Sequence, residues 1–362
     1  PRGIKLSPDG GTLFVAVSGT PKAGPPSSRT GARAGAGAGA GADDAQPANA
    51  DRSKDGIAVV DIAAGKLVRT IESGIDPEAF DVSPDGKRIY VSNEDAAALS
   101  VVDVDAGKVV ARVPVGKEPE GVTVSRDGKS VWVTSEADGT VAVIDTDNDV
   151  VTATIAVGPR PRGIALTRDG KRAFVSAENG ASVTIVDAAS KRKVGAIALA
   201  KGARPMGLAL SPDDKTLFVS NGRAGTIAVV DVKTGVIKST IAAVGARPWG
   251  IALSPDGTKL YAACGPSHEV AVVDVKSRAV TARLQSTGSP WGVAAERRAL
   301  RVCADPNNMP FSNEKGEGFD NKIAALIGDA LDARVVTTWR PERRGFVRHT
   351  VKAGLCDVVV GV

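Results

Sequence analysis

Residues 119–155 read PEGVTVSRDGKSVWVTSEADGTVAVIDTDNDVVTATI, and this stretch decides the fold. It holds four short apolar runs, at 121–125, 130–134, 141–145 and 151–155, separated by turn-forming residues. Each run has the length and the β-branched content of a strand, and Asp127-Gly128 between the first two is typical of a hairpin turn. The stretch therefore predicts a four-stranded antiparallel sheet.

The start of this stretch is repeated along the chain as Pro-x-Gly/Ala, an apolar run and a Ser/Thr-x-Asp-Gly turn. Copies begin at Pro1, Pro77, Pro119, Pro161, Pro205 and Pro248, and a broken seventh copy begins at Pro290. From Pro77 onward the starts lie 42 to 44 residues apart, which is the period of a four-stranded propeller blade. Six complete units and a further inner strand at Trp291–Ala294 predict a seven-bladed β-propeller over residues 1–296, with one blade incomplete in this chain.

The first unit is longer than the others because residues 19–55 are inserted in it. They include the run RAGAGAGAG at 33–41 and many Pro, Ser, Asp and Asn residues. Such a composition cannot bury enough apolar surface to order itself. We expect a disordered insertion here.

The composition excludes several classes of function. Two histidines, His268 and His349, are too few for a multi-histidine copper centre or a three-histidine zinc site, and the three cysteines form no CxxC or CxxCH motif. A net charge of +5 over 362 residues argues against a dedicated nucleic-acid binder. No apolar run is long enough to span a membrane. We expect no cofactor and no metal.

Strand direction assigns the loops to two faces. If the first strand of each blade lines the axis, the Asp-Gly turns lie on one face and the residue after each repeat proline surrounds the axis on the other. Equivalent positions in the neighbouring loops of that second face hold Glu94, Glu136 and Glu178. The residues predicted around the axis are Arg2, Glu78, Glu120, Arg162, Met206, Trp249 and Trp291.

Two interpretations of this second face stay open. Exposed tryptophans and charges on loops over a rigid scaffold are typical of a recognition surface. Alternatively, the tryptophans fill the channel mouth and the glutamates are merely solvated. On the turn face, the recurring lysines and arginines are best explained by solubility. Backbone capping, not metal binding, is expected of the aspartates that end the third strands, which are Asp61, Asp103, Asp145, Asp187, Asp231 and Asp274.

The repeat also resembles a known family. Residues 83–93 (SPDGKRIYVSN) are similar to the YVTN-type propeller repeat, and this similarity extends over residues 1–293. The variants DPEAFD at 76–81, EPEGV at 118–122 and RPRGI at 160–164 resemble the propeller proteins associated with PQQ-dependent alcohol catabolism. The vicinal cysteine pair expected of a quinoprotein dehydrogenase is missing, so the resemblance implies an accessory protein.

The pattern changes after residue 296. We expect a strand at 300–304, an amphipathic helix at 319–331, a strand at 334–338, a helix at about 344–353 and a strand at 357–362. This β-α-β-α-β order implies a parallel α/β segment over 297–362, about half of one lobe. Cys303 and Cys356 fall on or beside neighbouring strands, where they could form a disulfide or remain two buried thiols.

This segment resembles the quinoprotein dehydrogenase-associated solute-binding proteins, which have a periplasmic-binding-protein-like fold. The similarity rests on RVCADPNNMPFS at 301–312, GEGFDNKI at 316–323, WRPERRGFVR at 339–348 and GLCDVV at 354–359. Open α/β sheets bind ligands at the strand ends, so Asp305, Asn307 and Arg343 are candidate binding residues. They could equally cap a turn and solvate a helix start.

Together the two resemblances imply a non-enzymatic periplasmic accessory protein of PQQ-dependent alcohol (methanol or ethanol) oxidation. Its propeller would act as a binding platform, with a PQQ-dependent alcohol dehydrogenase or its cytochrome as partner. The alternatives are a lactonase-type propeller hydrolase and a simple solute-binding protein.

Overall fold

The computed structural model describes residues 3–19, 51–295, 298–331 and 333–360. The chain divides into two compact units, Pro1–Ala295 and Glu296–Val362, and each is described by itself. Within the described residues, no helix is long and apolar enough to cross a membrane.

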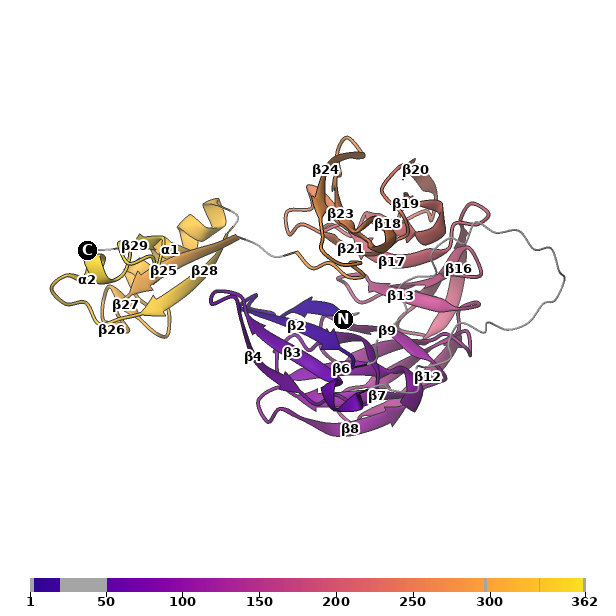
Figure 1. Ribbon diagram of the computed structural model, residues 1–362, viewed down its shortest axis with the longest axis horizontal. Coiled ribbons are helices and arrows are strands. Elements are labelled where there is room, and N and C mark those ends of the chain that lie inside the picture. Colours follow the sequence, from indigo (N-terminus) through magenta and orange to yellow (C-terminus); the bar gives the residue numbers. More distant parts are fainter. Residues whose placement is uncertain (1–2, 20–50, 296–297, 332, 361–362) are drawn as a thin grey trace. The chain divides into compact units, whose positions relative to one another are not determined.

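The first unit contains six four-stranded antiparallel sheets, which follow one another in chain order from indigo to orange in Figure 1. This arrangement confirms the predicted propeller. The blades consist of β1 (Ile4–Leu6), β2 (Thr12–Val17), β3 (Gly56–Asp61) and β4 (Lys66–Ile71); β5 (Pro77–Val82), β6 (Arg88–Asn93), β7 (Ala98–Asp103) and β8 (Lys108–Pro114); β9 (Pro119–Val124), β10 (Ser130–Ser135), β11 (Thr140–Asp145) and β12 (Val150–Ala156); β13 (Pro161–Leu166), β14 (Arg172–Ala177), β15 (Ser182–Asp187) and β16 (Arg192–Ala198); β17 (Pro205–Leu210), β18 (Thr216–Asn221), β19 (Thr226–Asp231) and β20 (Ile237–Ile241); and β21 (Pro248–Leu253), β22 (Lys259–Cys264), β23 (Glu269–Asp274) and β24 (Ala279–Gln285).

The hydrophobic core of this unit lies between the blades. Phe218 of blade five, for example, packs in one cluster with Ile251 and Leu260 of blade six, and all three are buried. The inner strands β1, β5, β9, β13, β17 and β21 contact one another in that order. Each blade therefore covers its neighbour's apolar face, which explains why both faces of the middle strands are apolar in sequence.

The recurring aspartates hold the turns, as predicted. Each of the six third-strand aspartates accepts a hydrogen bond from a backbone N–H two or three residues on, such as Asp187 from Ser190 at 2.8 Å. In the Ser/Thr-x-Asp-Gly turns, the hydroxyl donates to the aspartate, such as Ser125 to Asp127 at 2.6 Å. These bonds lower the pKa of Asp127 and its counterparts. The recurring aspartates of the turn face thus cap the backbone of the turns.

The glycine that follows every ring residue except Glu78, which Ala79 follows, lets adjacent inner strands approach closely. A Cβ on Gly163 would lie 2.6 Å from the carbonyl oxygen of Met206 in the next blade. The Ser176 hydroxyl accepts from Gly163 N at 2.9 Å and donates to Met206 O at 2.6 Å. Ser92, Thr134 and Ser220 bridge their own neighbouring blades in the same way. This repeated bridge fixes the backbone of the ring residues.

Two expectations for this unit need correction. Residues 286–295 form no strand, so the further inner strand at Trp291–Ala294 was wrong; Gly250 N instead donates a single hydrogen bond to Trp291 O at 2.9 Å. Six blades are described, and the seventh stays a prediction. Residues 20–50 of the insertion lie outside the described residues, but its end is ordered, because Arg52–Lys54 forms a 3-10 turn whose neighbour Asp55 accepts from Asp76 N at 2.9 Å.

The second unit has the predicted β-α-β-α-β order (Figure 1). Its parallel sheet places β25 (Arg298–Ala304) between β28 (Ala333–Trp339) and β29 (Val358–Val359), with helices α1 (Phe319–Ala330) and α2 (Phe346–His349) and a hairpin of β26 (Asn307–Asn308) and β27 (Ser312–Asn313). The second helix and the last strand are shorter than predicted. The disulfide is confirmed, with the Cα atoms of Cys303 and Cys356 5.6 Å apart.

Helix α1 turns the opposite side toward the sheet from the one that its apolar pattern suggests. Asp320, Ala324 and Gly328 are buried, whereas Phe319 and Leu326 are exposed. A Cβ on Gly328 would lie 2.6 Å from Val335 Cγ2, so the small side of the helix is what allows it to lie close to β28.

Candidate functional site

The structure brings the predicted ring residues together on one face of the propeller, although Arg2 lies outside the described residues. Neighbours around the axis touch: Arg162 Nη1 and Glu120 Oε1 lie 2.8 Å apart, and the rings of Trp249 and Trp291 meet edge to face at 81°. Met206, between these two groups, is buried. The face thus has an ionic sector on blades two to four and an aromatic sector formed by blade six and the segment that follows it.

The centre of the ionic sector is Arg162. Its guanidinium contacts three carboxylates: Glu120, Glu136 and Glu178, the last at 3.1 Å. Arg160 adds a second guanidinium, 2.8 Å from Glu136 Oε2 and 3.4 Å from Glu178 Oε2. We call these five residues the ionic cluster.

Burial corrects both interpretations of these side chains. Arg162, Glu136 and Glu178 are only 8%, 8% and 4% exposed, so the two glutamates are neither solvated nor part of an open recognition surface. Glu78 is also buried, whereas Glu94 and Glu120 are partly exposed. The charges turn inward because the ring position lies at the crowded axis, where Arg162 meets Glu120 and Glu136 of the preceding blade and Glu178 of its own blade.

The ionic cluster holds three carboxyl groups and two guanidiniums, so it is neutral only when one carboxyl carries a proton. Burial raises the pKa of Glu136 to about 8, with Glu120 and Glu94 adding to the effect and Arg162 and Arg160 opposing it. Burial by itself would lower the pKa of Arg162, but Glu120, Glu136 and Glu178 raise it overall. A proton on Glu136 is therefore the arrangement that balances the cluster.

A second acidic group lies on blade two. Asp76, Glu78 and Glu94 each place a carboxylate oxygen within 4.8 Å of the others. Asp76 Oδ1 also accepts from the Ser18 hydroxyl at 3.1 Å and lies 3.7 Å from Arg52 Nη1. The end of the insertion thus packs against this acidic group and supplies a positive charge to it.

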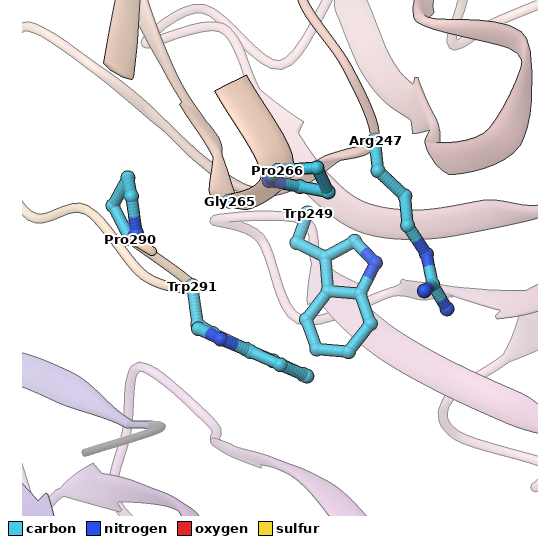
Figure 2. A pocket seen from close by; sticks show the side chains of 6 residues that line it. All are labelled: Arg247, Trp249, Gly265, Pro266, Pro290 and Trp291. Carbon is cyan, nitrogen blue, oxygen red and sulfur yellow. The ribbon is translucent and has the colours of Figure 1, made fainter. Parts of the chain in front are cut away.

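The aromatic sector contains a small pocket, shown in Figure 2. Trp249 stands between Arg247 and Trp291, and its indole nitrogen lies on the side of the ring that faces Arg247. The Arg247 guanidinium carbon is 5.1 Å from the centre of the Trp249 ring. The remaining lining residues are Gly265, Pro266 and Pro290.

Sequence reasoning missed the residue before each repeat proline. Asp76, Arg160 and Arg247 occupy this position and contribute to the acidic group, the ionic cluster and the aromatic pocket. The five examples in the complete copies from Pro77 to Pro248 have a positive φ: 47° at Asp76, 52° at Glu118, 56° at Arg160, 54° at Arg204 and 55° at Arg247. The recurrence of a charged residue at one repeat position was the available signal, since non-glycine residues rarely adopt this conformation without a reason.

In the second unit, the candidate residues follow the ends of parallel strands. Asp305, directly after β25, accepts from Asn307 N at 2.8 Å and also from Glu342 N in the loop after β28. Asn307 and Arg343 are exposed. Asp305 thus caps a turn and connects the loop after β25 to the loop after β28. The loops that hold Asp305 and Arg343 therefore lie at the same edge of the sheet.

Known proteins resemble parts of the chain. Residues 12–124 match the family model of the YNCE-like beta-propeller, and residues 161–294 match the model of the lactonase 7-bladed beta-propeller. A solved chain of hydrazine synthase from Kuenenia stuttgartiensis superposes with a TM-score of 0.65 at 21% identity, covering 81% of this chain and 88% of that one. These matches agree with the propeller fold.

Two curated proteins from Paracoccus denitrificans match shorter stretches. Protein MoxJ is 39% identical over 69 residues, which are 19% of this chain and 25% of MoxJ. An uncharacterized protein encoded in the cycB 3′ region is 48% identical over 45 residues, which are 12% of this chain and 54% of that protein. The chain thus spans about a quarter and about half of the length of these relatives.

Proposed function

We propose that this protein is a non-enzymatic accessory protein of PQQ-dependent alcohol oxidation, in which the axial face of the propeller binds a partner protein. The observation that carries the proposal is the contrast between the two faces. The turn face repeats self-capped aspartates, whereas the axial face gathers charged side chains from blades two to four and tryptophans from blade six and the segment after it onto one scaffold. Tryptophan and arginine side chains that stay partly exposed on a fixed scaffold, as Trp249, Trp291 and Arg247 do, are typical of binding sites.

The pathway is supported by similarity. The stretch 301–312 resembles quinoprotein dehydrogenase-associated proteins, and the chain matches part of MoxJ. The proposed partner is a PQQ-dependent methanol or ethanol dehydrogenase or its cytochrome. The Cys303–Cys356 disulfide supports a periplasmic location, because disulfides persist in oxidising compartments. A seventh blade, as in the lactonase model, and a complete binding-protein lobe would belong to the same proposal.

The test is direct binding. The full chain is immobilised, and a purified PQQ-dependent methanol dehydrogenase and its cytochrome c are passed over it separately. We expect saturable binding of at least one, lost in a Trp249→Ala/Trp291→Ala double variant and kept in a turn-face control, Lys129→Ala/Lys171→Ala. Binding of neither protein, or equal loss in the control, contradicts the proposal.

A lactonase-type hydrolase is the second candidate, favoured by the lactonase match and by the raised pKa of Glu136 beside Glu120. A carboxyl group with a pKa near neutrality can act in acid–base catalysis. This candidate requires ring opening of a lactone panel that disappears in Glu78→Gln, Glu120→Gln or Glu136→Gln. If the unaltered chain opens these lactones no faster than the uncatalysed background, the hydrolase candidate is excluded.

A further inference from the structure

The aromatic pocket, formed by blade six and the segments on either side of it, has two hydrogen-bond donors without an acceptor among the described residues. Trp249 Nε1 is buried and has no hydrogen-bond partner within the described part of the chain. Among the same residues, Arg247 forms neither an ion pair nor a side-chain hydrogen bond, although its side chain is partly buried. A buried donor left without a partner is costly, so such a group indicates a missing acceptor.

The Arg247 guanidinium and the Trp249 indole nitrogen lie on the same side of the Trp249 ring. The Arg247 guanidinium carbon lies 5.1 Å from the centre of the Trp249 ring, and the indole nitrogen lies on that side of the ring (Figure 2). A single acceptor group placed there could bind both. Carboxylate is the group that best matches a planar guanidinium, because its two oxygens accept bonds in one plane.

The surrounding charge favours an anion. Burial lowers the pKa of Arg247, and Glu178 opposes this effect. Three further guanidiniums lower the pKa of Arg247 as well, so several positive charges share this region; they belong to Arg223, Arg162 and Arg160. The one carboxylate among these groups, Glu178, is already paired with Arg160 and Arg162. Among the residues that the structure describes, Arg247 therefore has no paired carboxylate.

The other walls of the pocket are apolar. Trp291, Pro266 and Pro290 face the space beside Trp249, and the empty volume is about 190 Å³ with its open side included. This value includes open solvent, so the enclosed part of the pocket is small. An apolar group would lie against these walls with one side in solvent.

We propose that this pocket binds a monocarboxylate carrying a small apolar group, with the carboxylate on Arg247 and Trp249 Nε1 and the apolar group against Trp291 and the two prolines. The same chemistry occurs in a free organic acid and in the C-terminal residue of a peptide. The inference does not rest on the proposed partner protein.

The experiment titrates the full chain with benzoate and with its neutral counterpart benzamide, following tryptophan fluorescence and the indole ¹H–¹⁵N signals. We expect benzoate to shift the Trp249 indole signal saturably and benzamide not to. A peptide ending in a free phenylalanine carboxylate, compared with the same peptide amidated, separates the two sources. Benzoate binding alone identifies a free acid, and tighter binding of the free-carboxylate peptide identifies a chain end.

The variants locate the site. Arg247→Gln should weaken benzoate binding roughly ten-fold or more, because it removes the charged donor. Trp249→Phe should weaken it a few-fold while keeping the ring, and Arg223→Gln, an exposed arginine outside the pocket lining, is the matched control. Equal responses to benzoate and benzamide, no saturable shift at millimolar benzoate, or binding unchanged in Arg247→Gln overturns the proposal. Because no partner protein is present, failure here leaves the dehydrogenase-binding test unaffected.

Discussion

The ionic sector and the aromatic sector occupy the same repeat positions on one propeller face, yet they differ in how their polar groups are satisfied. In the ionic sector, Arg162 meets carboxylates from its own and the preceding blade and is 8% exposed. In the aromatic sector, Arg247 meets a tryptophan ring and no carboxylate among the described residues. The two positions on either side of the repeat proline thus hold Arg160 and Arg162 in a closed ion-pair cluster, and Arg247 and Trp249 in an open pocket.

The inner-strand backbone is the same in both sectors. The difference in how polar groups are paired therefore depends on which side chains the neighbouring blades contribute. The hydroxyl bridges of Ser176 and Ser220 both link a glycine N–H to the next blade's ring carbonyl. A closed cluster contributes mainly to blade cohesion and proton uptake. An open pocket keeps its donors for a ligand.

The largest expected effect is at the centre of the closed sector. Arg162→Met should reduce the free energy of unfolding by about 3–5 kcal/mol, because it leaves three carboxylates close together without their central buried cation. Arg160→Met, whose side chain is 42% exposed, should cost about 1 kcal/mol or less. Urea denaturation measures both. Equal costs would mean that burial does not distinguish the two arginines.

The next effect is a pH dependence from Glu136. Its folded pKa of about 8 exceeds the ordinary 4.5, so the folded state holds a proton that the unfolded state releases between these values. The resulting stabilisation is complete below pH 4.5 and is lost as the pH rises through 8, with a slope approaching about 1.4 kcal/mol per pH unit.

Glu136→Gln should remove this slope. The measurement is urea denaturation of the unaltered chain and the variant across pH 5–8.5 (roughly the interval between the two pKa values). The carbonyl of glutamine still accepts from Arg160, so the variant keeps the shape of the cluster. A slope that persists in the variant would assign the proton to another group.

The smallest effect tests whether the scaffold is truly common to both sectors. Ser176→Ala and Ser220→Ala each remove a hydroxyl that bridges two blades, and each should cost about 1–2 kcal/mol. Ser190→Ala, which loses only an exposed bond to Asp187, should cost less than about 0.5 kcal/mol. Thermal or urea unfolding measures all three. Unequal costs in the two bridging variants would show that the sectors differ in their backbone as well as their side chains.

Much of the fold could be predicted because the repeat is local. Alternating apolar runs, Asp-Gly turns and capped aspartates specify each blade within 42 to 44 residues, and the six aspartates act as expected. The further strand at Trp291–Ala294 failed because an inner strand needs a second strand of its own blade to pair with, and one hydrogen bond from Gly250 does not replace it. The side of helix α1 that packs against the sheet was predicted wrongly. The spacing of apolar residues cannot show that only the small side chains at Ala324 and Gly328 allow the helix to lie close to β28.

The positions of the candidate site residues could be predicted from the sequence, but the burial of their side chains could not. The residue after each repeat proline was placed on the axial face, and the neighbouring glutamates were placed beside it. Their burial was missed, because the exposure of a side chain at the axis depends on how closely six inner strands approach. The contributions of Asp76, Arg160 and Arg247 were missed because their positive φ is invisible in sequence.

The sequence by itself determined the blades, their order, the two faces and the cysteines able to pair, since each follows from short-range periodicity and turn chemistry. Only the tertiary structure decided that Arg162 is surrounded by carboxylates while Arg247 is not. That outcome depends on contacts between residues 16 to 42 positions apart, where a ring residue meets side chains of its own and the preceding blade. Local patterns carry no information about such meetings, because the distance between two side chains across the axis is fixed by the packing of the whole ring.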